Sequence, residues 1–402
     1  MKKYFCFKNT LILISFFTVL SGSIAISNAR GDEAGFDPNS VVFVTNRDSS
    51  DITIIDMNTD TIMDRIACGD WGNPHMACPT DDGKYLVTTC TQGNYASIID
   101  LQTKEVAKVR LGIMPEHFCV STDNKHAFIG NMGGGSVSVL DIGNKKVSAT
   151  IPGFFEPHGL VCTLDGSKVY VSNMGAHEVS IIDAETFNII KRIETGSADV
   201  LAMVNQLDMS NKLSEIVGAA NPTFTIDGLY AYVADGDSNQ VAVIDTSNDE
   251  IITTIPVGDE PWRAYASPDG TKMVVPNNGD QTISVIDVKK NKVTATFPGD
   301  EDMTGVNFVN DGKKAYVISR GESSLRVMDL QKMKELKRIK LPEGSSPETA
   351  STTPDGKKVY LAASQRNSVY VFDADTDKYK EIPNVGVSPW AVTIIGGANY
   401  CH

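Results

Sequence analysis

Short runs of alternating apolar residues, each closed by an aspartate, recur along the chain. The closing pair, an apolar residue followed by Asp, occurs at Ile55-Asp56, Ile99-Asp100, Leu140-Asp141, Ile182-Asp183, Ile244-Asp245, Ile286-Asp287, Met328-Asp329 and Phe372-Asp373. The intervals between these aspartates are 44, 41, 42, 62, 42, 42 and 44 residues. Alternation with a period of two indicates β-strands, and a repeat of about 40 to 45 residues is typical of the blades of β-propellers.

The repeat at residues 261–299 has the fullest pattern. It predicts four strands, at 262–267, 273–276, 282–287 and 293–297. Asp-Gly pairs mark the first turn of most repeats, because glycine adopts the positive φ that a tight hairpin requires. These pairs stand at 82–83, 165–166, 227–228, 269–270, 311–312 and 355–356. The sequence therefore predicts an all-β fold made of four-stranded blades.

The two ends of the repeat region complete one blade together. The repeats begin on a second strand, and the chain closes with an unpaired inner strand. Pairing residues 390–395 with residues 42–45 closes the ring and removes two exposed strand edges. This count gives a closed propeller of eight blades, or of seven if one repeat packs irregularly. We assign residues 41–402 to this single domain and residues 30–40 to an N-terminal lead.

The repeated aspartates are interpreted as turn residues. A carboxylate that closes a third strand can accept hydrogen bonds from the backbone of the following turn. We expect this role, and no catalytic one, because an active site needs groups that differ between repeats. The prediction covers Asp56, Asp100, Asp183, Asp245 and Asp287. We identify no catalytic residue in the sequence.

The 62-residue interval contains an insert at residues 197–221. Apolar residues recur there at helical spacing and predict one or two short amphipathic helices. They are Val200, Met203, Val204, Leu207, Leu213, Ile216 and Val217. The insert is interpreted either as a lid on its own propeller or as an element that docks a partner chain, since insertions on one face of a repeat protein often form its binding surface.

The N-terminus has the features of a secretory signal. Basic residues precede an apolar run at 11–20, and small residues at 27–29 form a cleavage site. We expect residues 1–29 to be removed and the product to be exported to a periplasm-like compartment; an uncleaved anchor is the alternative. No later segment approaches the roughly 20 apolar residues that a membrane-spanning helix needs, so we expect no membrane span.

The chain is acidic, with a formal net charge of −14. Loss of Lys2, Lys3 and Lys8 with the signal takes this charge to −17. Such a surface repels the phosphates of nucleic acid, so we expect no nucleic-acid partner. The charge suits solubility or a basic partner subunit.

Cysteines allow two further predictions. Outside the signal they are Cys68, Cys78, Cys90, Cys119, Cys162 and Cys401. In an oxidising compartment we expect one or two disulfides among the first five. The chain lacks the Cys-x-x-Cys-His motif of c-type haem. Its C-terminal segment 398–402 looks like that motif with Ala398 in place of the first cysteine, and a free or disulfide-bonded tail cysteine is the alternative.

Candidate binding residues are expected at the beginnings of the inner strands. In a propeller these strand ends lie on the same face as the loops between blades. Alignment on the proline before each inner strand puts six residues at this channel mouth: His75, Glu116, His158, Trp262, Glu348 and Trp390. His117 follows Glu116, and His177 lies after the strand at 169–173. Two imidazoles and a carboxylate suit a first-row transition metal. We take His75, Glu116, His158 and His177 as candidate haem- or metal-binding residues; solvated rim residues are the alternative.

Several strings carry a family resemblance. Val-Tyr-Val-Ser-Asn at 169–173, Val-Ala-Val-Ile-Asp at 241–245, Thr-Ile-Pro-Val-Gly at 254–258 and Ser-Pro-Asp-Gly-Thr-Lys at 267–272 resemble the YVTN family of β-propeller repeats, over residues 41–395. The resemblance implies the fold. It leaves the function open, because such propellers occur in surface-layer proteins, in the haem-binding propeller of cytochrome-type nitrite reductase and in non-catalytic subunits of redox complexes.

An exported, acidic chain of eight repeats that ends in Gly-Gly-Ala-Asn-Tyr-Cys-His also resembles the β subunits of hydrazine synthases from anaerobic ammonium-oxidising bacteria. This resemblance implies a cofactor-free, non-catalytic scaffold in an oxidoreductase complex that condenses nitric oxide and ammonium into hydrazine. It implies multihaem cytochrome-type partner subunits that carry haem c, a dimer of heterotrimers, and a place in the anammoxosome lumen. The alternatives are a haem- or metal-binding propeller enzyme and a surface-layer protein.

Overall fold

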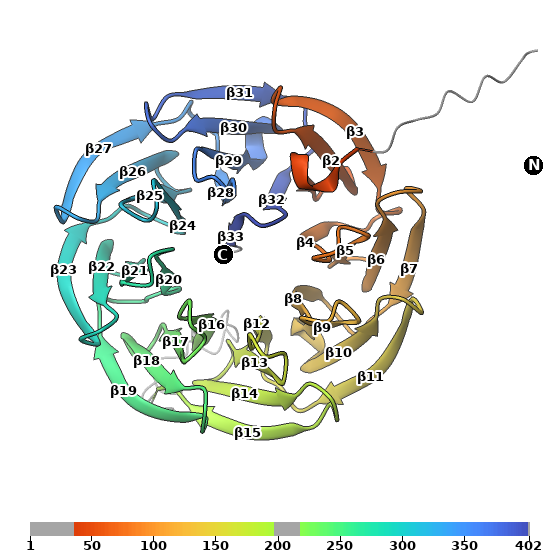
Figure 1. Ribbon diagram of the computed structural model, residues 1–402, viewed down its shortest axis with the longest axis horizontal. Coiled ribbons are helices and arrows are strands. Elements are labelled where there is room, and N and C mark those ends of the chain that lie inside the picture. The colour runs from red at the N-terminus through yellow and green to blue at the C-terminus, as the bar shows by residue number, and fades with distance from the viewer. Residues whose placement is uncertain (1–35, 197–217, 401–402) are drawn as a thin grey trace, which may run out of the picture. The chain divides into compact units, whose positions relative to one another are not determined.

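The computed structural model describes residues 36–196 and 218–400, which form eight antiparallel sheets arranged as blades around a common axis (Figure 1). We call the region enclosed by the inner strands of the blades the channel. Residues Phe36–His402 make up one compact unit. The prediction of a propeller with eight blades is confirmed. The predicted signal at residues 1–29 and the apolar positions Val200 to Val217 of the insert lie outside the described residues.

The strands of each blade follow one another from the channel outward. Blade 1 contains β32 (Pro389–Ile394), β1 (Val41–Asn46), β2 (Asp51–Asp56) and β3 (Thr61–Ala67). Blade 2 contains β4 (Pro74–Pro79), β5 (Tyr85–Cys90), β6 (Tyr95–Asp100) and β7 (Val106–Arg110). Blade 3 contains β8 (Pro115–Val120), β9 (His126–Asn131), β10 (Ser136–Asp141) and β11 (Lys146–Pro152). Blade 4 contains β12 (Pro157–Cys162), β13 (Lys168–Asn173), β14 (Glu178–Asp183) and β15 (Ile189–Glu194).

The second half of the ring repeats this order. Blade 5 contains β16 (Ala219–Phe224), β17 (Tyr230–Asp235), β18 (Gln240–Asp245) and β19 (Glu250–Pro256). Blade 6 contains β20 (Tyr265–Ala266), β21 (Lys272–Asn277), β22 (Thr282–Asp287) and β23 (Lys292–Pro298). Blade 7 contains β24 (Met303–Val309), β25 (Lys314–Ser319), β26 (Ser324–Asp329) and β27 (Lys334–Lys340). Blade 8 contains β28 (Pro347–Thr352), β29 (Lys358–Ala363), β30 (Ser368–Asp373) and β31 (Tyr379–Pro383), and β33 (Ala398–Tyr400) pairs with β28 on its channel side.

Helical structure in the described residues is limited to three short 3₁₀ turns, η1 (Pro38–Ser40), η2 (Met132–Gly134) and η3 (Ser364–Arg366). Within residues 36–196 and 218–400, no helix has the length and apolar character needed to cross a membrane.

Two predicted boundaries are wrong. The insert was predicted to extend to Asn221, but β16 already begins at Ala219. The inner strand of blade 6 was predicted at 262–267, but only residues 265–266 pair regularly. An isolated bridge joins Pro261 to Asn277, and the backbone between this bridge and β20 leaves the ladder.

The ring closes where the two ends of the chain meet. β32 pairs antiparallel with β1, with Val42 opposite Ile394 and Val44 opposite Val392. The predicted pairing of the last inner strand with the first second strand is therefore confirmed. It gives β1 a neighbour on both sides, so β1 is not left as an edge strand.

The core lies between the blades. Each middle strand is buried on both of its faces, because neighbouring blades pack on it from either side. The described residues form eight apolar clusters, and each cluster joins two neighbouring blades. Tyr316 of blade 7, for example, packs with Val359 and Tyr370 of blade 8. Each blade is thus stabilised by its neighbours.

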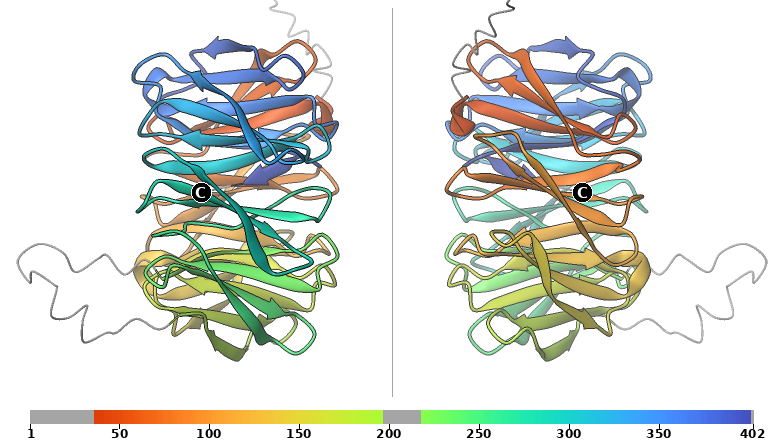
Figure 2. Two further views of the ribbon diagram at one scale, coloured as in Figure 1. Left: turned by 90° about the vertical axis from the view of Figure 1, so that its left-hand side faces the viewer. Right: turned by 90° about the vertical axis from the view of Figure 1, so that its right-hand side faces the viewer.

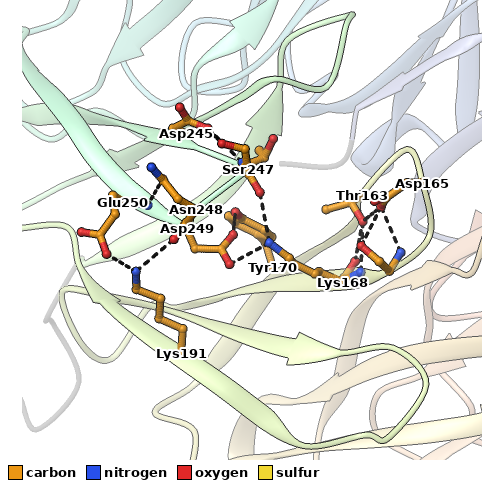
Figure 3. Close-up of polar contacts among 12 residues, drawn as sticks. Thr163, Asp165, Lys168, Tyr170, Lys191, Asp245, Ser247, Asn248, Asp249 and Glu250 are labelled. Atoms are coloured by element: carbon orange, nitrogen blue, oxygen red, sulfur yellow. Dashed lines mark hydrogen bonds and ion pairs between the residues drawn. The ribbon is translucent and has the colours of Figure 1, made fainter.

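A polar contact reinforces three of these junctions, and we call it the blade clasp. In blade 4 a lysine and a tyrosine of β13 reach an aspartate in the β18–β19 turn of blade 5 (Figure 3). Lys168 Nζ lies 2.7 Å from Asp249 Oδ2, and the hydroxyl of Tyr170 donates to Asp249 Oδ1. The equivalent trios are Lys314, Tyr316 and Asp377 between blades 7 and 8, and Lys358, Tyr360 and Asp60 between blades 8 and 1.

The strands run between the two faces of the ring, as the side views show (Figure 2). We call one of them the mouth face. It carries the loops that connect one blade to the next and the loops between second and third strands. The other two loops of each blade lie on the opposite face.

The repeated aspartates stabilise turns on that opposite face, as predicted. Asp56 Oδ1 accepts hydrogen bonds from the amides of Asn58 and Thr59, at 2.6 and 2.9 Å. The other predicted aspartates also accept hydrogen bonds from backbone amides of the turns that follow them: Asp100, Asp183, Asp245 and Asp287. The Asp-Gly turns agree with prediction too, since Gly83, for example, has a φ of 66°.

We expect Asp100→Ala to lower the free energy of unfolding by about 1 kcal/mol, the scale of a local hydrogen bond between partly solvated groups. Urea denaturation of the variant measures this change. A variant of unchanged stability would contradict a turn role, and lost function at unchanged stability would contradict the expectation that this residue is not catalytic.

The predicted disulfides are wrong. Cys68, Cys78, Cys90, Cys119 and Cys162 are all free thiols. Burial raises the pKa of Cys78 to about 12 and that of Cys90 to about 11. These thiols therefore stay protonated and act as small apolar side chains in a core that is large enough without cross-links.

Candidate functional site

Three histidines from successive blades meet at the channel mouth. His75 lies on β4, His117 on β8 and His158 on β12, and we call these three residues the mouth cluster. The Nε2 atoms of His75 and His117 are 3.3 Å apart, and the ring centroids of His117 and His158 are 4.0 Å apart. Their exposed fractions are 6%, 4% and 6%. The cluster is therefore a row of buried imidazoles in mutual contact.

Two indoles flank this row. The ring of Trp390 on β32 lies 5.7 Å from that of His75, and the ring of Trp262 lies 5.7 Å from that of His158. The guanidinium of Arg47 stacks over Trp390 at 4.2 Å. Arg47 also donates from Nε to the side chain of Asn73, at 3.0 Å. Aromatic faces and a cation thus border the imidazoles on the mouth face.

Hydrogen bonds across blade junctions position the backbone of these residues. The hydroxyl of Thr45 in blade 1 donates to the carbonyl of His75 in blade 2 at 3.2 Å. The hydroxyl of Thr349 in blade 8 donates to the carbonyl of Trp390 in blade 1 at 3.0 Å. His75 and Trp390 are therefore held by the preceding blade as well as by their own strands.

The charge state of His158 is set by its surroundings. Burial lowers its pKa from 6.5 to about 4, and the nearby positive charge of Arg263 acts in the same direction. The backbone of Ala220 opposes this shift only in part. His158 is therefore a neutral imidazole at neutral pH, and a neutral imidazole offers a lone pair.

On the side of the channel opposite the mouth cluster, the mouth face carries a network of charged side chains. Glu348 on β28 is buried, and it accepts hydrogen bonds from Arg320 at 3.0 Å and from Ser346 and Ser364 at 3.0 and 2.6 Å. Arg320 also pairs with Asp302 at 2.6 Å. A cavity of about 200 Å³ lies beside this network, lined by Trp262, Asn278, Asp302, Met303, Thr304 and Arg320.

The predicted ligand set of His75, Glu116 and His158 is only partly assembled. The structure brings His75 and His158 into one row, but the ring between them is that of His117. The inner strands β4, β8 and β12 each have a register irregularity just after their first proline, so strict alternation does not apply there. Within residues 36–196 and 218–400, no group of three or more His, Cys, Asp or Glu side chains has a geometry that could hold a metal ion.

Glu116 lies at the edge of the cluster. Burial raises the pKa of its carboxyl group, and the positive charge of Arg47 opposes the shift. The hydroxyl of Thr89 donates to its backbone carbonyl at 2.5 Å. Its side chain therefore faces an arginine and joins no ring of the mouth cluster.

His177 lies apart from the mouth cluster, in the β13–β14 loop. Its Nδ1 is 2.7 Å from Asp235 Oδ1, and Asp235 also accepts a hydrogen bond from Thr195 at 2.9 Å. The bond to Asp235 raises the pKa of His177. Ser238 approaches the same Nδ1 at 3.5 Å, so the three groups do not form a relay through both ring nitrogens. The pair joins blades 4 and 5.

The first half of the ring resembles a known family of sequences. Residues 35–212 match the YNCE-like beta-propeller family. No curated protein sequence matches the chain significantly.

Two solved structures are similar to most of the chain. A dihydro-heme d1 dehydrogenase, NirN, in complex with DHE aligns with a TM-score of 0.72 and 18% identity, covering 90% of this chain and 76% of that one. Kuenenia stuttgartiensis hydrazine synthase aligns with a TM-score of 0.54 and 19% identity, covering 78% of this chain and 96% of that one. At these identities the alignments establish a common propeller fold.

Proposed function

We propose that the chain binds a haem-type macrocycle at its channel mouth. The observation that carries this proposal is the mouth cluster, three buried imidazoles in a row between two indoles at the opening of an eight-bladed channel. A structural role alone would be served by apolar residues, since buried polar groups cost free energy unless they are satisfied. The similar structure of a dihydro-heme d1 dehydrogenase was determined in complex with DHE, which supports a ligand of this class.

The side chains present fit such a group. The Nδ1 atom of His158 is buried and has no hydrogen-bond partner among the described residues. One imidazole of the mouth cluster would bind the iron, since haem iron takes only one or two protein ligands. Trp262 and Trp390 would contact the flat face of the ligand, and Arg47 and Arg263 would attract its carboxylates. When bound, haem iron supplies a Lewis acid with redox activity. The protein contributes the neutral imidazole of His158 and a border of aromatic side chains.

The test is a titration of the purified full chain with ferric haem, followed by the Soret band. We expect a saturable red shift with a single equivalent of haem. His117→Ala should weaken binding about tenfold or more, which corresponds to roughly 1.4 kcal/mol or more of lost contacts.

The matched control is His126→Ala, because this histidine begins β9 on the opposite face. Equal affinities of the wild type, His117→Ala and His126→Ala would mean that the haem binds elsewhere and would refute the assignment. Absence of a Soret shift in the wild type would refute the proposal itself.

A second candidate function is a cofactor-free scaffold in an extracytoplasmic redox complex of the hydrazine synthase type. It is favoured by the exposed apolar side chains on the mouth face and by the net charge of −14, which suit a basic partner. The similarity to hydrazine synthase supports the same candidate. A native preparation that is colourless as an isolated chain and co-purifies with multihaem cytochromes would favour this scaffold over the haem-binding function.

A further inference from the structure

Large apolar side chains are exposed on consecutive loops of the mouth face. Val387, Trp71, Ile113, Met114 and Phe155 lie on the loops that join blades 8 to 1, 1 to 2, 2 to 3 and 3 to 4, and we call these five residues the apolar arc. Their exposed fractions are 48%, 84%, 59%, 42% and 57%. A single exposed apolar residue is ordinary, but five on neighbouring loops of one face are typical of an interaction surface.

The equivalent loops from blade 5 to blade 8, which the structure describes in full, carry acidic side chains. Ile113, Phe155 and Val387 each stand two residues before the proline that begins or precedes an inner strand. Asp259 occupies this position in the loop from blade 5 to blade 6. Among the described loops of this half, exposed acidic residues include Asp259, Glu260, Asp280, Glu301 and Glu343, and we call these five residues the acidic arc. Asp237 and Glu322 are exposed on the same face. The repeat therefore places apolar and acidic side chains at matching sites around one opening.

The loop backbone does not require apolar residues at these positions. Met114, Glu156, Glu260 and Asp302 all adopt a φ between 49° and 53° just before their inner strands, although their side chains differ. The same turn is thus built with apolar or acidic residues. Backbone geometry therefore does not account for the large apolar side chains on one half of the ring.

The charge of the mouth face restricts which kind of partner can bind there. The apolar half also carries the exposed carboxylates Asp48 and Asp70, so carboxylates lie on both halves of the opening. Arginines of this face have partners within the chain: Arg47 stacks on Trp390, Arg320 pairs with Asp302 and Glu348, and the exposed Arg366 pairs with Glu381. A second copy of this chain would bring like charges together, whereas a basic surface would be attracted.

We propose that the mouth face docks a basic protein whose own apolar patch is bordered by lysines and arginines. The apolar arc supplies the buried contact, and the acidic arc steers the partner and fixes its orientation. This inference is independent of the proposed haem site, because none of its residues belongs to the mouth cluster. It places the partner directly over the channel opening.

The probe is a small basic c-type cytochrome, since such a protein carries an apolar haem edge ringed by lysines. Binding of the full chain to the immobilised probe is measured at several salt concentrations. We expect an affinity that falls with salt, as for other encounters between opposite charges. Ile113→Ser combined with Phe155→Ser should weaken it about tenfold or more, the usual scale for loss of apolar anchors. Glu260→Gln combined with Glu301→Gln should slow association and reduce the salt dependence.

The matched control is Leu164→Ser combined with Ile226→Ser. These side chains are 62% and 67% exposed on the opposite face, so the control removes similar apolar surface without touching either arc. Its affinity should equal that of the wild type, and equal melting temperatures of all variants establish that each is folded. A probe whose lysines are acetylated should not bind.

Three results would overturn the proposal: no binding of the wild type to the basic probe, apolar-arc variants that bind as tightly as the control, or self-association of the wild type that the apolar-arc substitutions abolish. The last would identify a second copy of the chain as the occupant. Haem titration of the same variants separates this outcome from failure of the haem proposal, because arc substitutions leave the mouth cluster intact.

Discussion

Asp249→Ala is expected to lower the free energy of unfolding by about 3 kcal/mol, because it leaves the charged end of Lys168 without its counter-charge. Lys168 then keeps only its hydrogen bond to the carbonyl of Thr246. The side chains of Lys168 and Asp249 are 21% and 9% exposed, so water reaches this ion pair only in part. Tyr170 loses its acceptor as well, and an unsatisfied buried hydroxyl adds to the cost. Urea denaturation at neutral pH gives the value.

Two variants test the physical reason. Asp245→Ala in the same turn is the control: its carboxylate is exposed and bonds only to Ser247, so a much smaller loss is expected. Lys168→Met added to Asp249→Ala should be less destabilising than Asp249→Ala alone, because replacing both charges avoids the uncompensated one. If Asp249→Ala cost no more than Asp245→Ala, the blade clasp would not stabilise the junction.

The aspartates of the blade clasp also make the free energy of unfolding depend on pH. Burial alone would raise the pKa of Asp60, but hydrogen bonds from Lys380, Tyr360 and Lys358 outweigh it and lower the pKa. The pKa of Asp377 is lowered in the same way. A carboxyl with a lowered folded pKa stabilises the fold above its unfolded pKa of 3.8, and this contribution is lost as the pH falls through the folded pKa. The clasp is therefore fully formed at neutral pH.

The blade count and ring closure could be predicted from sequence because their signals are local. Each third strand ends in a turn that its own aspartate stabilises, and the period of these turns follows directly from the chain. The closing pair needed one further argument, that an unpaired edge is unfavourable. It required no knowledge of side-chain contacts.

The side-chain contacts between blades could not be predicted from the sequence in this way. His117 joins the mouth cluster, whereas alignment on the proline before each inner strand favoured Glu116. The choice between these two neighbours depends on the local backbone of β8, which has a register irregularity just after its proline. The disulfide prediction failed because cysteine count and compartment say nothing about where a thiol lies in the core.

The blade clasp was missed although it has a sequence signal. Its lysine and tyrosine stand as Lys-x-Tyr at the start of second strands, at Lys168, Lys314 and Lys358, and its aspartate follows the turn aspartate of the next blade by four residues. Finding it requires comparison of each repeat with the following one, because the partners lie in neighbouring blades. Patterns within single repeats cannot reveal it.

The mouth cluster carries the other large effect, a loss of stability in mild acid that depends on His158. Its pKa falls from 6.5 to about 4 on folding, so between these values the unfolded chain binds a proton that the folded chain excludes. The free energy of unfolding therefore decreases as the pH is lowered from 6.5 towards 4, by up to about 3 kcal/mol in total. Above pH 6.5 this group has no effect on stability, since it is neutral in both states.

His158→Gln removes the titrating group and should flatten the curve of stability against pH over that interval. Urea denaturation of both proteins at pH 7.5, 5.5 and 4.5 measures the difference, and the comparison cancels the carboxylates, which both proteins share. The variant loses some stability at every pH because glutamine packs less well against His117 and Trp262. The decisive quantity is thus the change with pH. Equal pH dependence in the two proteins would show that the imidazole of His158 is accessible to protons in the folded state, contrary to its burial in the mouth cluster.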